Sequence, residues 1–216
     1  MTDIILPEQF SLSRALAQNK PKKVLARRWR KRSAVVALLD DDHVKSASLL
    51  MIQRARREGD PWSGHMAFPG GRSEKHDRNG LATAKREMHE EVGFDADAKE
   101  HRHLNAQVIG RLSDLATPKR SLAKQMVITA YVMKVEERPA LQPNHEVENA
   151  LWIPLSYFAD PENREIRPFK IAGDWHDLPC LHYADDQVIW GMTLRMIDEI
   201  LRIQGYQIPN MVGRIK

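Results

Sequence analysis

Three carboxylates crowd into five residues, at Glu87, Glu90 and Glu91, shortly after the glycine pair Gly70-Gly71. In a helix these positions are i, i+3 and i+4, so their side chains leave from the same face. Like charges this close repel one another, and a hard divalent cation with oxygen ligands would relieve that repulsion. The alternative is a solvated acidic face on a surface helix. The spacing therefore indicates a candidate cation site.

The flanking residues predict a helix over residues 80–92 that presents a separate core face. Asn79 can cap its start, and Gly93 can end it in the left-handed conformation. Arg86 stands one turn before Glu90 and is expected to pair with that carboxylate. The apolar positions share one stripe of the helix, which comprises Leu81, Ala84, Met88 and Val92. The helix therefore has a start, a stop, a core face and an acidic face.

The sequence of this helix and its C-terminal end resembles a motif of a known family. The run Arg86-Glu87-Met88-His89-Glu90-Glu91-Val92-Gly93-Phe94 is similar to the second half of the Nudix box, which reads Arg-Glu-apolar-any-Glu-Glu-any-Gly-apolar. The first half departs from the box, because Asp77 stands one position ahead of the usual glutamate and Arg78 occupies that glutamate's place. The shifted Asp, the Phe-Pro-Gly-Gly of residues 68–71 and the run 188–193 resemble the coenzyme A pyrophosphatase branch. The resemblance covers residues 33–204.

The resemblance implies an α/β fold, the Nudix α/β/α sandwich with a mixed sheet, after a short helical and basic N-terminal extension. The expected division is an extension over 1–32, a Nudix hydrolase domain over 33–204 and a tail over 205–216. The implied activity is Mg²⁺-dependent hydrolysis of a phosphoanhydride bond in a nucleoside diphosphate derivative, with coenzyme A as one candidate. Mn²⁺ is an alternative ion. The box implies that Glu87, Glu90 and Glu91 are the metal ligands.

The expected catalytic residues are Glu90, Arg86 and Glu146. Either a box glutamate or Glu146, six residues before Trp152, is the candidate general base. The alternative for Glu146 is a solvent-exposed loop carboxylate. Arg86 is interpreted as an orienting group. Asp77 is open to three roles, a secondary ligand, a helix-proximal cap or a partner for Arg86, of which a structural role is favoured.

The expected substrate-binding residues are Arg54, Trp62, Gly70 and Gly71. Glycine lets the main chain approach an ion or a phosphate closely. Trp62 can stack on a base, although packing in the core is the favoured interpretation. The branch signature is altered upstream of the glycines, where Ala55, Trp62, His65 and Met66 replace its Ser, His, Gln and Val. We therefore expect a changed or relaxed preference for coenzyme A.

Composition agrees with a small soluble enzyme. The 216 residues suit one domain with appendages, and 42% hydrophobic and 29% charged residues are ordinary globular values. The single cysteine, Cys180, excludes an intramolecular disulfide and is interpreted as a packed, inert thiol. The sequence has neither an apolar run long enough to span a membrane nor the start of a secretion signal, so a cytoplasmic location is expected. The expected partner is a small molecule, with no membrane, nucleic acid disfavoured and a homodimer left open.

Residues 20–32 are strongly basic, with eight Lys and Arg residues among thirteen positions. A solvated lead-in with Trp29 buried against the domain is the first interpretation, and a rim that gathers anionic substrate is the second. Nucleic-acid binding ranks third, because only Trp29 interrupts the run with an aromatic ring. The open alternatives for function are a hydrolase of nucleoside triphosphates or nucleic-acid ends, and a non-catalytic binding module of the same fold.

Hydrophobic periodicity and turn residues predict a mixed order of helices and strands. Helices are expected at 8–19, 80–92 and 191–203. Strands are expected at 34–39, 48–52, 107–112, 126–135 and 151–154, with a late hairpin from 161–170 and 178–183. Residues 66–68 are expected to lead into the turn at 69–71. Residues 139–149 are expected to form a loop.

Overall fold

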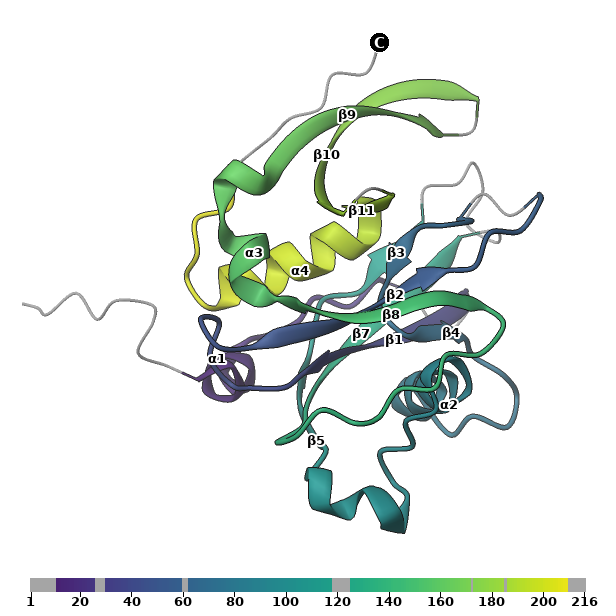
Figure 1. The fold of residues 1–216 in the computed structure, drawn as a ribbon, viewed down its shortest axis with the longest axis vertical. Helices are drawn as coiled ribbons and strands as arrows, with labels where there is room; N and C mark the ends of the chain where they lie inside the picture. Colours follow the sequence, from purple (N-terminus) through teal and green to yellow (C-terminus); the bar gives the residue numbers. More distant parts are fainter. Residues whose placement is uncertain are drawn as a thin grey trace, which may run out of the picture.

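The computed structural model describes residues 11–25, 30–59, 62–117, 125–171, 173–184 and 186–209. Figure 1 shows a large sheet with α2 (Gly80–Val92) on one side and α4 (Gly191–Ile203) on the other. A smaller sheet rises beyond α4. This arrangement confirms the predicted α/β/α sandwich.

The large sheet has eight strands and mixed direction. Its central order is β3-β2-β1-β7-β5, while β4 pairs with β1, β6 with β7 and β8 with β2. The long strands are β1 (Lys31–Leu39), β2 (Ser48–Arg54), β7 (Met126–Lys134) and β8 (Val147–Pro154). The short ones are β3 (Met66–Ala67), β4 (Gly70–Arg72), β5 (Gln107–Arg111) and β6 (Leu115–Ala116). The pair β1–β7 is parallel and the other pairs are antiparallel, so the predicted mixed sheet is confirmed.

Strand β1 is buried on both faces, as expected for a central strand covered by helices on each side. Its Val36 and Leu38 belong to the cluster that packs with Met88 of α2. Its Ala37 and Leu39 belong to the opposite cluster, to which α4 contributes Leu194, Ile197 and Leu201. Two hydrophobic layers therefore fix α2 and α4 against the same sheet.

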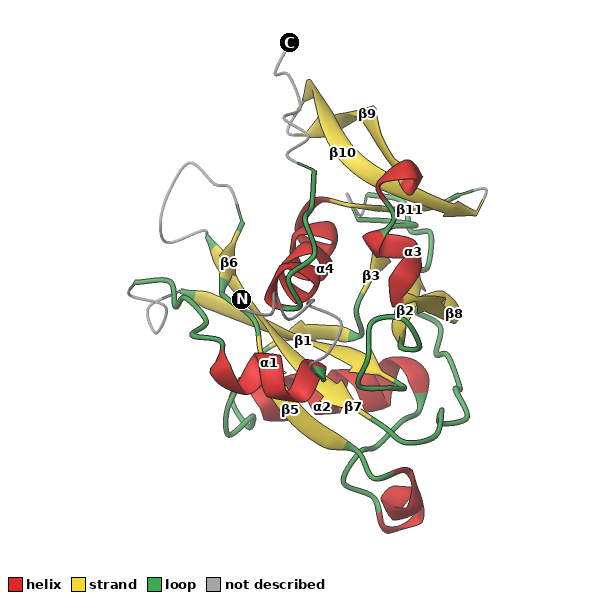
Figure 2. Ribbon diagram, turned by 90° about the vertical axis from the view of Figure 1, so that its left-hand side faces the viewer, coloured by secondary structure: helices red, strands yellow, loops and turns green. Residues whose placement is uncertain are grey.

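The smaller sheet is antiparallel, in the order β11-β10-β9. It is formed by β9 (Arg164–Ile171), β10 (Asp174–Ala184) and β11 (Gln187–Trp190), and follows α3 (Leu155–Ala159) and a 3₁₀ turn (Pro161–Asn163). Figure 2 shows the β9–β10 hairpin standing clear of the large sheet. Its base is anchored, because Arg164 Nη2 lies 2.6 Å from Asp198 Oδ1 of α4 in a largely buried ion pair.

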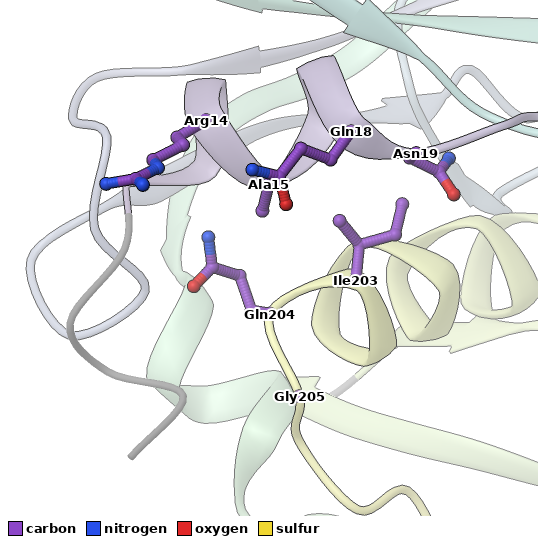
Figure 3. A pocket seen from close by; sticks show the side chains of 7 residues that line it. All are labelled: Arg14, Ala15, Gln18, Asn19, Ile203, Gln204 and Gly205. Carbon is purple, nitrogen blue, oxygen red and sulfur yellow. The ribbon is translucent and has the colours of Figure 1, made fainter. Parts of the chain in front are cut away.

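Helix α1 (Leu12–Gln18) packs against β5 and the end of α4. Its Leu12 and Leu16 are buried in the same cluster as α4, and a Cβ at Gly110 would lie 2.8 Å from Leu16 Cβ. A cavity of about 350 Å³ lies between α1 and the end of α4, and Figure 3 shows the side chains that line it. Its polar lining is amide and guanidinium groups, from Arg14, Gln18, Asn19 and Gln204. None of the described residues that line this cavity carries a carboxylate.

Most expected elements agree with the structure, and two helices agree to the residue, at 80–92 and 191–203. The expected strand at 151–154 was too short, because β8 already pairs with β2 at Val147. Strands β3, β4, β6 and β11, helix α3 and the 3₁₀ helix Lys99–Leu104 were missed, since each is too short to show a periodic pattern. The first part of the expected helix at 8–19 lies outside the described residues. No helix in the part of the chain that the structure describes has the length and apolar character to cross a membrane.

Candidate active site

The capping of α2 follows the sequence. The Asn79 side chain accepts a hydrogen bond from the backbone N–H of Ala82 at 3.0 Å, and Gly93 ends the helix at a φ of 76°. Because both ends are fixed and Met88 and Val92 are buried, the rotation of the helix about its axis is set. That rotation decides where each glutamate points.

The three glutamates do not share one environment. Glu91 is only 3% exposed, and its Oε2 accepts a hydrogen bond from the backbone N–H of Gly70 at 2.8 Å. Glu87 and Glu91 both line a cleft of about 690 Å³. Glu90 does not line this cleft, and its side chain is 52% exposed. The structure therefore brings two of the three predicted ligands together and places the third at the surface.

The glycine pair makes room for this arrangement. A Cβ at Gly71 would lie 2.3 Å from Glu87 Oε2, so only glycine leaves space for that carboxylate. A Cβ at Gly70, which has a φ of 152°, would lie 2.4 Å from the carbonyl oxygen of Ala34 in the neighbouring strand. Both predicted glycines thus lie in the cleft, and each is required by a different close contact.

Arg86 connects the acidic residues. Its Nη1 lies 3.0 Å from Glu90 Oε2, which confirms the predicted pair, and its Nη2 lies 3.0 Å from Glu87 Oε1. Its Nε donates to Asp77 Oδ1 at 3.1 Å, and its Nη2 also donates to the carbonyl oxygen of Arg72. A guanidinium group can satisfy several acceptors at once because its donors are held in a fixed fork. Arg86 therefore fixes the orientation of its acidic neighbours.

Of the three roles open for Asp77, the structure shows the partner of Arg86. The Asp77 side chain is 4% exposed and also accepts hydrogen bonds from the Thr83 hydroxyl and the Glu74 backbone N–H. The Arg86 guanidinium holds the pKa of Asp77 well below its usual range, and Asp77 in turn raises the pKa of Arg86. The shifted acidic residue of the box thus anchors the arginine.

Burial raises the pKa of Glu91 to about 8, and the nearby Glu87 adds to that effect while the Gly70 hydrogen bond opposes it. Burial also raises the pKa of Glu87, with Arg86 acting in the opposite direction. A raised pKa means that the protein alone stabilises the charged forms poorly. A bound cation would stabilise the charged forms of the two carboxylates and displace the proton that burial favours.

Other charged side chains surround the carboxylates. Arg54 lines the cleft as predicted, and Arg72, which directly follows the glycine pair, lines it as well. Glu146 also lines the cleft, where its Oε1 lies 3.1 Å from Arg57 Nη1. Sequence reasoning missed Arg72, although its position beside Gly71 was a usable signal.

The favoured interpretation of Trp62 as a core residue is wrong. Its side chain is 44% exposed and lines the cleft. The reason is local, since Trp62 lies in the turn between β2 and β3, outside both hydrophobic clusters. Cys180, in contrast, is fully buried, and burial raises the pKa of its thiol to about 11, which confirms the packed thiol.

Most of the remaining lining is apolar, with Ser33, His65 and Thr193 as the polar exceptions, and the sequence alone indicated no role for most of it. Four of the seven methionines among the described residues line the cleft, namely Met66, Met126, Met192 and Met196. Trp190 stacks on Phe169 with ring centroids 4.0 Å apart, and meets His65 edge-on at 5.1 Å. The sequence of residues 188–193 resembles the coenzyme A pyrophosphatase branch, but the contact of this run with the cleft depends on how the second sheet folds.

The basic segment lies partly outside the described residues, which exclude Arg27, Arg28 and Trp29. Lys31 and Arg32 begin β1 and directly precede Ser33, which lines the cleft. The Arg30 guanidinium donates to Gln125 Oε1 at 2.5 Å. The interpretations of this segment stay predictions.

Two carboxylates of the cleft are suitable ligands for a divalent cation. Among the described residues, no group of three or more His, Cys, Asp or Glu side chains is arranged to hold a metal ion. Mg²⁺ retains several waters and commonly uses one or two carboxylates together with substrate phosphates. Glu87 and Glu91 meet that requirement in a partly buried position where their charge lacks full compensation.

The chain is similar to several known proteins. An uncharacterized protein of Schizosaccharomyces pombe is 37% identical over 116 residues, covering 53% of this chain and 34% of that protein. The peroxisomal coenzyme A diphosphatase of Mus musculus is 29% identical over 139 residues, covering 62% of this chain and 54% of that protein. The chain thus spans about a third to a half of the length of these relatives. A solved Nudix hydrolase from Nitrosomonas europaea is 12% identical, with a TM-score of 0.48 over 84% of this chain and 93% of that one.

The family profile described as NUDIX domain matches residues 29–171, which is more than half of the chain. The matched range includes α2 with its glutamates and the glycine pair at β4. It ends within the second sheet, at the last residue of β9. The chain therefore belongs to the Nudix domain family.

Proposed function

We propose that this protein is a divalent-metal-dependent hydrolase that cleaves the phosphoanhydride bond of a nucleoside diphosphate derivative. Water adds across the P–O–P linkage, and the products are a nucleoside monophosphate and a second phosphate ester. The observation that carries the proposal is the convergence of Glu87, Glu91 and the Gly70-Gly71 backbone in one cleft.

The metal would be held by Glu87 and Glu91, with Mg²⁺ as the first candidate and Mn²⁺ as an alternative. When bound, such an ion neutralises phosphate charge and lowers the pKa of a bound water. The ligand and catalytic roles of Glu90 stay predictions, because in this structure Glu90 pairs with Arg86 outside the cleft. Arg86 would act as a positioning residue, because it holds Glu87 on one side and Asp77 on the other.

Other charged residues of the cleft would bind the substrate and activate the attacking water. Arg54 and Arg72 would bind the diphosphate, since guanidinium groups pair well with phosphate oxygens. Glu146 would act as the general base outside the box, because it lines the same cleft as Glu87 and Glu91. Its contact with Arg57 would hold it in place before substrate binds.

Coenzyme A is a candidate substrate, because a relative is named as a coenzyme A diphosphatase. The altered residues upstream of the glycines argue for a changed preference, and Trp62 and His65 among them line the cleft. The cytoplasmic location and the homodimer stay predictions from the sequence. Substrate choice is therefore the property that an experiment must decide.

The test is a panel of phosphoanhydrides assayed with Mg²⁺, with Mn²⁺ and with a chelator. Coenzyme A, ADP-ribose, diadenosine polyphosphates and nucleoside triphosphates cover the alternatives, and phosphorus NMR identifies the bond that is cleaved. We expect metal-dependent cleavage between two phosphorus atoms of at least one nucleoside diphosphate derivative. Absence of turnover on the whole panel with either ion would favour the binding module.

A matched pair of variants shows whether turnover arises in this cleft. Glu91→Gln removes a buried carboxylate of the cleft, whereas Glu100→Gln removes an exposed one from the surface 3₁₀ helix. The first should lose activity and the second should keep it. Equal activity in the two variants would assign the hydrolysis to another site or to a contaminating enzyme.

A further inference from the structure

The cleft has two chemically different ends. The acidic end is formed by α2 and β4, within the range that the family profile matches. The opposite end includes Trp190, Met192 and Met196, which lie in β11 and α4 beyond that range. The part of the chain after Ile171 therefore supplies side chains to the cleft that the matched family range does not.

This apolar end is held firmly in place. Trp190 stacks on Phe169 at an interplanar angle of 12°, which ties β11 to β9, and Ile171 at the end of β9 lines the cleft. Met196 is 3% exposed and belongs to the hydrophobic cluster that carries α4. The second sheet and α4 thus form one packed unit beside the acidic end.

The chemistry of this unit suits a flexible apolar group. A polar sugar or a second nucleoside would need hydrogen-bond partners here, because burying an unpaired polar group is costly. Ile171, Met192 and Met196 offer apolar side chains, and this segment adds only the hydroxyl of Thr193 and the indole N–H of Trp190 as polar side-chain groups. Methionine is unbranched and adapts to irregular shapes, so it tolerates apolar chains of varied length.

We infer that the segment after Ile171, together with Ile171 itself, determines specificity by binding an extended apolar arm on the phosphate distal to the nucleoside. The inference rests on the proposed function, because it places the diphosphate at the acidic end. It assigns the preferred substrate class as nucleoside diphosphates esterified to a flexible apolar chain.

The test uses ADP monoalkyl esters with methyl, butyl, hexyl and octyl groups, with ADP-ribose as the polar reference. The bond that is cleaved is the same in all the esters, so differences in kcat/KM among them measure the contribution of the alkyl group to recognition. We expect kcat/KM to rise with each added methylene that the cleft buries, by up to about fourfold per methylene. ADP-ribose should resemble the methyl ester.

Two variants test whether the alkyl arm of the substrate binds at this end of the cleft, and a third variant serves as their control. Met192→Asn and Ile171→Asn should flatten the dependence on chain length, so that the ratio of kcat/KM between the octyl and methyl esters falls toward one. Ile166→Asn is the control, because Ile166 lies on the same strand as Ile171 but is 42% exposed and does not line the cleft. The ratio between octyl and methyl esters within one variant cancels any loss of folded enzyme.

The outcomes separate the two proposals. Hydrolysis of the methyl ester and ADP-ribose without a gain for longer chains would overturn the inference and leave the proposed function standing. A gain that persists unchanged in Met192→Asn and Ile171→Asn would also overturn it. If no ADP derivative is cleaved with Mg²⁺ or Mn²⁺, the proposed function itself fails, and the inference fails with it.

Discussion

The two ends of the cleft differ in how they are built as well as in their chemistry. The acidic end takes its carboxylates from one helix and its backbone groups from one glycine turn, close together in sequence. The apolar end collects side chains from β3, β7, β9, β11 and α4, which are spread over the chain. Local sequence therefore specifies the acidic end, whereas long-range packing assembles the apolar end.

This difference suggests that the two ends of the cleft have different roles in the reaction. Cleaving a phosphoanhydride needs charge compensation at fixed positions, so small displacements at the acidic end should be costly. An apolar surface stabilises a bound substrate in proportion to the apolar area that is buried, so each side chain contributes only part of the binding free energy. Substitutions at the acidic end should consequently have larger effects than substitutions at the apolar end.

The largest effect is expected for Glu91→Gln. The variant keeps the shape of the buried side chain but removes a charge from the cleft, so kcat should fall by about 10²-fold or more. Glu90→Gln is the informative partner, because Glu90 is exposed and paired with Arg86. Mn²⁺ affinity measured by calorimetry should fall for Glu91→Gln. An equal fall for Glu90→Gln would restore Glu90 as a ligand and show that binding reorients it.

The next effect concerns the glycine pair. In Gly71→Ala the new Cβ meets the end of the Glu87 side chain, which can rotate away, so activity should fall about tenfold or more with little loss of stability. In Gly70→Ala the new Cβ meets the backbone of β1, so the free energy of unfolding should fall by about 1–3 kcal/mol. Denaturant titration and kcat measured on both variants check this. Reversed outcomes would contradict the assigned contacts.

Removal of metal should reveal the raised pKa of Glu91, which burial brings from 4.5 to about 8. Between these values the folded protein binds more protons than the unfolded chain, so stability is highest below the lower value and is lost as the pH rises toward the upper one. We expect the metal-free protein to lose stability from about pH 4.5 to pH 8 and Glu91→Gln to lose less. Mg²⁺ should stabilise the wild type more at pH 8 than at pH 6, because the ion competes with the proton. Thermal unfolding at several pH values provides the measurement.

The smallest effect is expected for Trp62→Ala, which removes an exposed ring from the edge of the cleft. Loss of stacking on a substrate base should raise KM by about threefold to tenfold and leave kcat unchanged. Trp175→Ala is the matched control, because Trp175 is 56% exposed on the β9–β10 hairpin and does not line the cleft. A change in kcat for Trp62→Ala would contradict this expectation and indicate that Trp62 acts together with the residues at the acidic end of the cleft.

The acidic half of the site could be predicted because its determinants are local. The caps at Asn79 and Gly93, the stripe of Met88 and Val92 and the pair of Arg86 with Glu90 all act within one helix. Helical geometry relates residues three and four apart without reference to the rest of the chain. The bounds of α2 and the contact between Arg86 and Glu90 therefore followed from the sequence.

Tertiary structure decided what local spacing left open. The sequence placed Glu87, Glu90 and Glu91 on one side of a helix, but only the packing of that helix on the sheet buried Glu91 and left Glu90 exposed. Residues more than a hundred positions apart, such as Met66 and Met192, meet in one cleft only after the two sheets have assembled. Local pattern determines helix faces and caps, whereas burial and long-range contacts depend on the packing of the whole chain.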